Sequence, residues 1–250
     1  MQPNPRQDLP AAPQNAPMPP KMTAQELDDF IYLISHDVRA SVRALIELPQ
    51  WIAEDLDDAG VNVKGPLADS ISLMNRHTGR LDRMLVDLLT FSRIGRMQTS
   101  GAVDLREAVE TVLEELSLKS NVTVIQDFET PHMWLGERDA LTLIHALIKN
   151  AVTHHDKKAV RVVIRTMREG STTVLEVSDD GPGITEASWE RVFHPMVTLK
   201  PRDEVEGSGM GLAMVRKIAT INGGSARLSS SRYGRGTRVE VRLPVGSVKN

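Results

Sequence analysis

Ile34-Ser-His-Asp-Val-Arg-Ala-Ser-Val-Arg-Ala-Leu45 is the stretch from which the fold of this chain can be worked out. When successive residues are placed about 100° apart, as on an α-helix, the apolar residues in and around it fall on one stripe that only Ser41 interrupts. The members of this apolar stripe are Leu27, Phe30, Ile34, Val38, Leu45, Leu48, Ile52 and Leu56. The pattern predicts a long helix that contributes the stripe to a core.

His36 lies almost opposite the apolar stripe, on the polar face of the predicted helix. A histidine there is not needed for packing, and the carboxylate of Asp37, which follows directly, could hold or deprotonate the imidazole. We therefore treat His36 as a candidate nucleophile with Asp37 as its partner. An ordinary solvated histidine fits the same position, so the assignment depends on the rest of the chain.

The composition excludes several classes of protein. A chain of 250 residues is long enough for one large or two modest domains, and a net charge of −3 gives no reason to expect nucleic acid as a partner. The absence of cysteine excludes disulfides and thiolate metal sites. No apolar run approaches the roughly 18 residues of a membrane span, and no signal peptide is recognisable. We expect a soluble, cytoplasmic protein without a membrane segment.

Proline distribution and helical periodicity divide the first half of the chain. Seven of the 14 prolines lie in residues 1–21, so residues 1–22 are expected to form a disordered tail. A first helix is expected from Ala24 to Asp58, capped by Thr23, and a second from Pro66 to about Ile94. This antiparallel hairpin has more apolar surface than it can bury, so two chains are expected to form a dimeric four-helix bundle.

The pattern after Gly101 predicts an α+β sandwich, a sheet with helices on one face. Strands are expected at residues 122–128, 160–167, 172–178, 225–230 and 237–243. Helices are expected at residues 104–118, 139–154, 186–193 and 210–221. The chain therefore combines a helical hairpin with a sheet-based domain.

Two segments of the sheet-based domain carry side chains suited to a nucleotide. Asn150, late in a predicted helix, offers an amide oxygen of the kind that Mg²⁺ accepts. Asp179 ends a predicted strand, where its carboxylate can accept a hydrogen bond from an adenine amino group, and Gly181 and Gly183 let the backbone come close to the base. Each signal is weak by itself, because a capping asparagine or a common glycine turn fits the same residues.

A third segment is rich in glycine and opens the last predicted helix. Gly207, Gly209, Gly211 and Leu212 are expected to bind the nucleotide at the start of this helix. Backbone N–H groups there point at a bound phosphate, and the helix dipole attracts it. The polar stretch 196–206 before it has the composition of a lid, although an ordinary solvated loop fits as well. The pair His154-His155 before Asp156 lacks a convincing set of metal ligands, and no function is assigned to it.

Taken in this order and spacing, the segments resemble those of the sensor histidine kinases of two-component signalling over about residues 24–245. The matching motifs are Ser35-His36-Asp37-Val38-Arg39, the helix 79–93, Asn150, Asp179-x-Gly181-x-Gly183, Val192-Phe193-His194-Pro195 and Gly207-x-Gly209-x-Gly211. The resemblance implies a dimerisation and histidine phosphotransfer domain at 23–97, and at 98–250 a catalytic ATP-binding domain of the histidine kinase, gyrase and chaperone ATPase type. The sequence around residues 202–212 is most similar to phytochrome-type members.

The resemblance implies an ATP-dependent autokinase. The imidazole of His36 would attack the γ-phosphoryl group of ATP while Asp37 accepts its other ring N–H, and Asn150 would bind Mg²⁺. The phosphoryl group would then pass to an aspartate of a response-regulator receiver domain. Because no sensor domain is recognisable, we expect either a fragment of a longer kinase or input from a separate sensor protein.

Some positions depart from the family pattern. Ala40 stands where a hydroxyl or amide side chain usually assists dephosphorylation of the receiver, Ser41 replaces a proline, Ala146 replaces an asparagine and Thr153 a basic residue. Two alternatives remain open: a non-catalytic histidine phosphotransferase or scaffold with a decayed ATP domain, and an ATPase clamp of the same superfamily. The intact nucleotide motifs argue against the first alternative. The His36 helix argues against the second.

Overall fold

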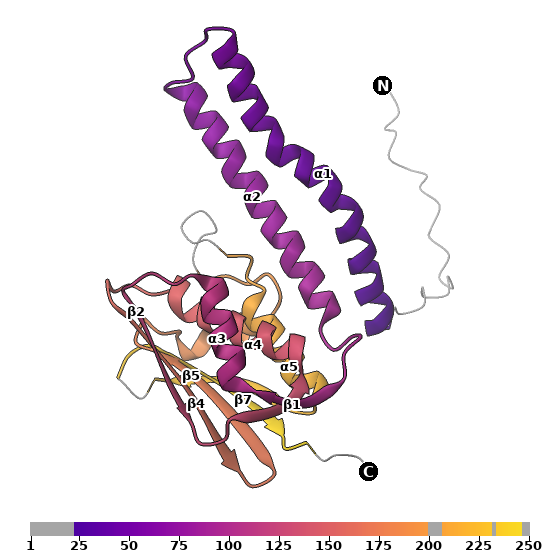
Figure 1. Cartoon of the computed structure of the whole chain (residues 1–250), viewed down its shortest axis with the longest axis vertical. Coiled ribbons are helices and arrows are strands. Elements are labelled where there is room, and N and C mark those ends of the chain that lie inside the picture. The colour runs from indigo at the N-terminus through magenta and orange to yellow at the C-terminus, as the bar shows by residue number, and fades with distance from the viewer. Residues whose placement is uncertain (1–22, 200–206, 232–233, 247–250) are drawn as a thin grey trace, which may run out of the picture.

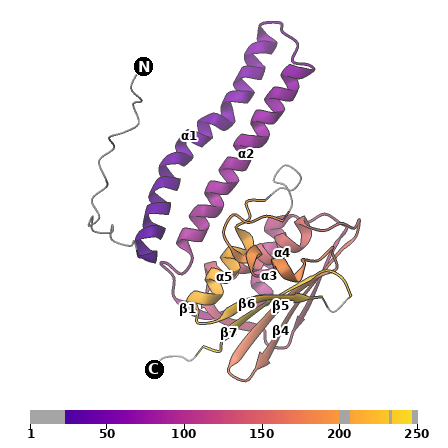
Figure 2. The same ribbon diagram turned by 180° about the vertical axis from the view of Figure 1, so that it is seen from behind.

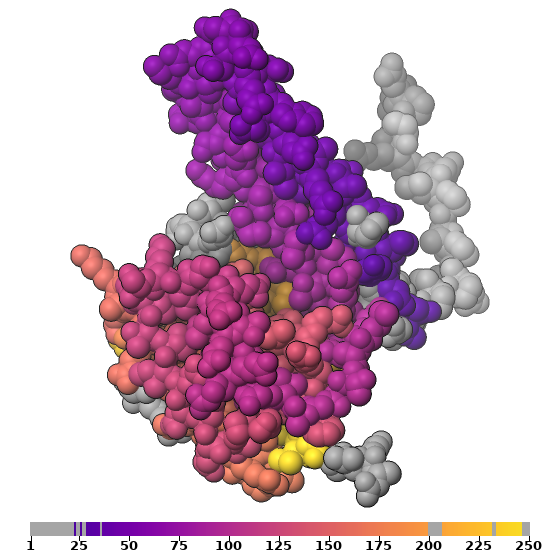
Figure 3. Space-filling view, viewed as in Figure 1, coloured from indigo at the N-terminus to yellow at the C-terminus, as the bar shows by residue number. Residues whose placement is uncertain are grey.

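The computed structural model describes residues 23–199, 207–231 and 234–246. Five side chains of the first helix, including that of His36, are not described, and the predicted tail 1–22 lies outside the described residues. A helical hairpin and an α+β body make up the described chain. The hairpin stands clear of the body over most of its length (Figures 1 and 3).

The hairpin consists of α1 (Ala24–Asp58) and α2 (Pro66–Arg93), with the bounds that the periodicity predicts. α1 begins with a capping box: Thr23 Oγ1 accepts from the Glu26 amide at 3.1 Å, and the Glu26 carboxylate accepts from the Thr23 amide at 2.8 Å. Pro66 occupies the first turn of α2, where its missing N–H costs no helical hydrogen bond. No helix of the described ranges is both long and apolar enough to cross a membrane.

Within one chain, α1 does not turn the apolar stripe toward α2. Ser35, Val42 and Pro49, which recur at every second turn, are its buried residues. The stripe and a matching set on α2 are exposed; these side chains are Phe30, Ile34, Val38, Leu45, Leu48 and Ile52 on α1, and Leu67, Leu73, Met74 and Leu81 on α2. Small and compact residues let the two helices approach closely, so the larger apolar side chains are left at the hairpin surface.

A five-stranded mixed sheet forms one layer of the body. In spatial order its strands are β2 (Val122–Phe128), β4 (Val160–Glu169), β5 (Thr172–Asp179), β7 (Thr237–Pro244) and β6 (Ser225–Ser230). Only β2 and β4 run parallel; the other neighbours are antiparallel. The second layer is α3 (Leu105–Leu116), α4 (Glu137–Thr153) and α5 (Gly211–Ile221), which cover one face of the sheet (Figures 1 and 2). The α+β prediction is confirmed.

Two parts of the body differ from the prediction. A separate two-stranded ribbon, β1 (Ser100–Asp104) with β3 (His132–Gly136), was not predicted, because each strand is short and its partner is distant in sequence. The helix predicted at 186–193 is wrong: the structure has two single 3₁₀ turns, η1 (Glu186–Ser188) and η2 (Arg191–Phe193). A segment this short depends on tertiary contacts for its conformation, and here Val192 and Phe193 are buried in the core.

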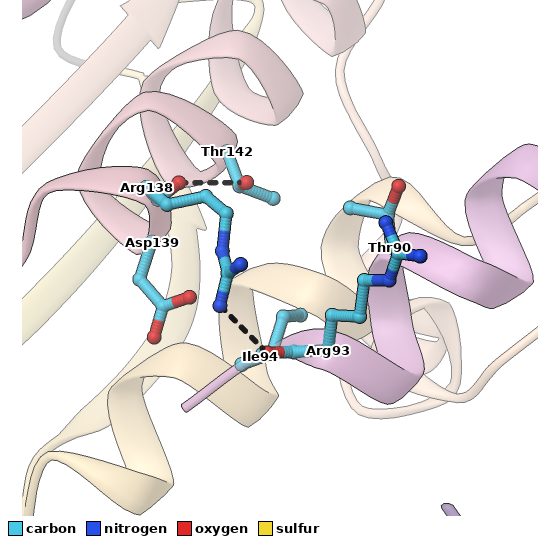
Figure 4. Close-up of a pocket in the computed structure, with 6 residues that line it drawn as sticks. All are labelled: Thr90, Arg93, Ile94, Arg138, Asp139 and Thr142. Atoms are coloured by element: carbon cyan, nitrogen blue, oxygen red, sulfur yellow. Dashed lines mark hydrogen bonds between the residues drawn. The ribbon is translucent and has the colours of Figure 1, made fainter. Parts of the chain in front are cut away.

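Polar contacts join the end of α2 to the body. The Lys217 ammonium group donates to the Phe91 carbonyl at 2.9 Å, and the Gly95 amide donates to the buried carboxylate of Asp139 at 3.0 Å. Figure 4 shows Arg138 reaching from α4 to the Arg93 carbonyl, at 3.3 Å, beside a cavity of about 230 Å³. The bonds from Lys217 and Arg138 satisfy carbonyl groups that the end of a helix leaves without partners. The hairpin and the body are therefore held together at the base of α2.

Candidate nucleotide-binding site

Asp179, the last residue of β5, is a buried carboxylate with one oxygen already bonded. Its side chain is 8% exposed, and Oδ1 accepts from the amides of Gly181 at 2.8 Å and Thr237 at 3.1 Å. Burial raises the pKa of Asp179, while the two amide bonds act in the opposite direction. Both of these hydrogen bonds from described residues are accepted by Oδ1, and neither is accepted by Oδ2. The carboxylate is held by one oxygen and can accept from a ligand through the other.

The glycines after Asp179 are required by the fold of the chain itself. Gly183 has φ of +82°, and a Cβ added there would lie 3.0 Å from the Gly236 carbonyl oxygen. A Cβ added to Gly181 would lie 2.9 Å from Asp179 Oδ1. These residues therefore let the turn fold tightly around Asp179 and against the β6–β7 turn, a role that the sequence did not reveal.

The glycine-rich segment lies at the start of α5, which begins at Gly211, one residue later than predicted. Gly209 has φ of +75°, and an added Cβ would lie 2.7 Å from the Val197 carbonyl oxygen, so the segment is packed against the first residues of the predicted lid. Residues 200–206 of that lid lie outside the described residues. The side chain of Leu212 is buried in the core, so it anchors α5 from inside.

Two further contacts fix this end of α5. Ser208, between the first two glycines, is buried; its hydroxyl donates to the carboxylate of Asp87 in α2 and accepts from the Met210 amide at 3.2 Å. Phe193 is also buried, and the Arg216 guanidinium lies 4.1 Å from the centre of its ring. The glycine-rich segment is thus attached to the hairpin on one side and to the body on the other.

Asn150 lies on α4 and is partly exposed. Ala146, one turn earlier, lies 3.9 Å from a Cβ built on Gly211, so this face of α4 is directed toward the start of α5. No described hydrogen bond uses the side-chain amide of Asn150. In the described part of the chain no group of three or more His, Cys, Asp or Glu residues could hold a metal, so Mg²⁺ would need phosphate and water oxygens besides this amide oxygen. That ligand set is one that Mg²⁺ favours.

The structure does not bring the histidine helix to the nucleotide site of the same chain. His36 belongs to α1, and the neighbouring Asp37 is exposed. In Figures 1 and 2, α2 is the hairpin helix nearer the body and α1 lies on its far side. The two halves of the predicted chemistry therefore lie in separate parts of the molecule.

Asp180 and His155 are residues near the site that the sequence did not single out. Asp180 accepts from His155 Nε2 at 2.8 Å, from Lys157 Nζ at 2.6 Å and from the Arg161 amide at 3.1 Å. Burial acts to raise the pKa of Asp180, but the bonds from Lys157, His155 and the amide outweigh it and hold the pKa far below its ordinary value. The sequence assigns no role to His155, whereas in the structure its side chain is 2% exposed and bonded to Asp180. Its nearness to Asp180 depends on tertiary structure.

We expect Asp180→Asn to remove stability that is present at neutral pH and lost in acid. Because the folded-state pKa is depressed, the contribution is complete above the unfolded pKa of about 3.9 and disappears as the pH falls through the folded pKa. Urea unfolding should show a loss of about 1–3 kcal/mol near neutral pH, and the difference from the native chain should shrink in more acidic buffer. Asp127→Asn, at an exposed ion pair, is the control. A difference that does not change with pH would contradict the prediction.

Comparison with known proteins finds a family match over the residues of this site. Residues 136–247 match the family described as histidine kinase-, DNA gyrase B- and HSP90-like ATPase. The methanogenesis regulatory histidine kinase FilI of Methanothrix harundinacea is 30% identical over 228 residues, which cover 88% of this chain and 25% of FilI. The chain thus spans about a quarter of the length of this relative.

Two solved structures share the fold. Full-length ShkA in complex with AMPPNP has a TM-score of 0.65 at 17% identity, over 88% of this chain and 46% of ShkA. The histidine kinase ThkA in complex with the response regulator protein TrrA has a TM-score of 0.61 at 18% identity, over 90% of this chain and 65% of that chain. Residues 136–247 thus match the ATPase family shared by histidine kinases, gyrase B and HSP90, and the chain is similar over most of its length to a regulatory histidine kinase.

Proposed function

We propose that this chain is an ATP-dependent protein histidine autokinase, which phosphorylates His36 and passes the phosphoryl group to an aspartate of a response regulator. The observation that carries the proposal is the buried carboxylate of Asp179, held by Oδ1 alone, in an ATPase-family domain joined to a hairpin that contains His36 and Asp37. The complex of ThkA with TrrA supports a response regulator as the partner.

Each part of the site has a separate role in binding the nucleotide. Asp179 Oδ2 accepts from the adenine amino group, and the backbone amides of Gly207–Gly211 at the start of α5 bind phosphate oxygens. Asn150 offers its amide oxygen to Mg²⁺, which when bound neutralises phosphate charge. Positioning and charge neutralisation are the main requirements of phosphoryl transfer, because the nucleophile forms its bond without covalent help from other groups.

His36 supplies that nucleophile. An unprotonated imidazole nitrogen forms a bond to the γ-phosphorus while the bond to the ADP oxygen breaks, and Asp37 accepts the remaining ring N–H. Since α1 lies apart from the nucleotide site, the reaction requires the body to move relative to the hairpin, or the site of a second chain to approach His36.

The exposed apolar surface of the hairpin supports a homodimer. Leu45 is 45% exposed and Phe30 is 53% exposed, and the stripe continues along α1 with matching residues on α2. An apolar surface of this length is ordinarily covered in a soluble protein. A second hairpin packed on the stripe would give a four-helix bundle with His36 on its outer, polar side.

Phosphorylation of His36 is tested by incubating the chain with γ-labelled ATP and Mg²⁺. The label should be lost in acid and stable in base, as a phosphoramidate is, and absent from His36→Ala. His77→Ala, at an exposed histidine of α2, should label normally. Acid-stable label that survives His36→Ala would exclude His36 as the acceptor, and nucleotide binding without any label would favour the non-catalytic scaffold.

Adenine binding by Asp179 is tested with Asp179→Asn. The substitution removes a charged acceptor, and we expect the dissociation constant for ATP, measured by calorimetry, to rise by about 10- to 100-fold. Asp127→Asn, at the exposed surface of the sheet, should leave the affinity unchanged. Unchanged affinity in Asp179→Asn would refute this role.

Dimerisation is tested by Leu45→Lys, which places a charge in the middle of the apolar stripe. We expect the molar mass measured by light scattering at micromolar concentration to fall from that of two chains to that of one. Gln50→Lys, at an exposed polar position of the same helix, should remain dimeric. A native chain that is monomeric under the same conditions would overturn the proposed bundle.

A further inference from the structure

Three loops meet behind Asp179 and are bonded to one another. His155 and Lys157, in the loop after α4, donate to Asp180 in the turn after β5. Asp156 of the same loop forms an ion pair with Arg235 of the β6–β7 turn at 2.7 Å. The β6–β7 turn also lies directly against Asp179, because a Cβ added to Gly236 would overlap the Asp179 carbonyl oxygen. The loop after α4 therefore braces both segments that hold the Asp179 carboxylate.

His155 is the buried member of this arrangement, and both of its ring nitrogens are engaged. Nδ1 accepts from the Lys157 amide at 3.1 Å, which assigns the proton to Nε2, and Nε2 donates to Asp180 Oδ1 at 2.8 Å. The side chain is 2% exposed, so the imidazole has no free nitrogen with which to act as an acid, a base or a metal ligand. Its geometry is that of a support.

Gly181 connects His155 to Asp179. The ring carbon Cδ2 of His155 lies 3.4 Å from a Cβ built on Gly181, so the imidazole packs directly against this residue. The Gly181 amide is one of the two donors to Asp179 Oδ1. The ring thus fixes Gly181 by contact and Asp180 by a hydrogen bond, and these two residues set the position of the amide that orients the Asp179 carboxylate.

We propose that His155 is a positioning residue for adenine recognition: with Asp180 it sets the direction of Asp179 Oδ2 and thereby the preference for adenine over guanine nucleotides. This inference rests on the proposed function. Adenine presents an amino donor at the position where guanine presents a carbonyl acceptor, so a correctly aimed carboxylate favours adenine and repels guanine. A carboxylate that can rotate loses part of both effects, whereas phosphate binding at the start of α5 is unaffected.

The test is calorimetric binding of AMPPNP and GMPPNP, each with Mg²⁺, to the full chain and its variants. His155→Ala should weaken AMPPNP binding by about 10-fold, the loss of one orienting hydrogen bond, and leave GMPPNP binding unchanged or stronger, so that the adenine preference falls. His155→Gln, whose amide can donate to Asp180, should restore most of the preference. His154→Ala, at the exposed neighbouring histidine, is the matched control. Far-ultraviolet circular dichroism checks that each variant is folded.

His155→Ala empties space in the interior, so a second variant is needed that weakens the same arrangement without creating a cavity. Lys157 is partly exposed, so Lys157→Met removes its bond to Asp180 without emptying buried space; a smaller fall in adenine preference is expected. Equal weakening of both nucleotides, or no change in either His155→Ala or Lys157→Met, would overturn the role of His155. If one of these contrary results is found while Asp179→Asn still weakens AMPPNP binding, the His155 inference fails and the proposed function stands. If the native chain binds neither nucleotide, both fail.

Discussion

The nucleotide-binding half of this protein depends on how the Asp179 carboxylate is accommodated in the interior. A buried charge is costly unless it receives hydrogen bonds, and here two backbone amides supply them, one from the turn after β5 and one from the start of β7. Because both donors are main-chain groups, the carboxylate fixes the backbone of two strands as well as its own rotamer. The same bonds that lower the cost of burial therefore hold together the backbone segments that surround the Asp179 carboxylate.

The junction with the hairpin follows a similar principle. The last carbonyl groups of α2 have no partners within the helix, and side chains from α4 and α5 bind them: Arg138 at Arg93 and Lys217 at Phe91. The ammonium nitrogen of Lys217 also lies over the Phe91 ring, 4.3 Å from its centre. Cations at the C-terminus of α2 are favoured by the helix dipole as well. The body is thus docked onto an end of a helix that carries opposite partial charge.

Much of this architecture can be predicted from the sequence, for physical reasons that differ between elements. α1 extends over 35 residues with a capping box at its start, so its type and its bounds follow from periodicity and local hydrogen bonding. Asp179 and the glycine-rich segment were recognisable because their order and spacing match a family. The β1–β3 ribbon, the packing face of α1 and the burial of His155 were not predictable, since each depends on residues that are distant in sequence. The small residues Ser35 and Val42 form the hairpin seam although larger apolar residues lie beside them.

The hydrogen bond from Ser208 to Asp87 has a mechanical consequence. Ser208 lies between two glycines just before α5, and Asp87 lies on α2 of the hairpin. A rotation or translation of α2 must therefore either carry the glycine-rich segment with it or break this bond. Coupled equilibria are reciprocal, so if occupancy of the segment changes the orientation of α2, then torque applied to α2 changes that occupancy by the same factor. The Ser208 hydroxyl is thus a direct mechanical link between the hairpin and the start of α5.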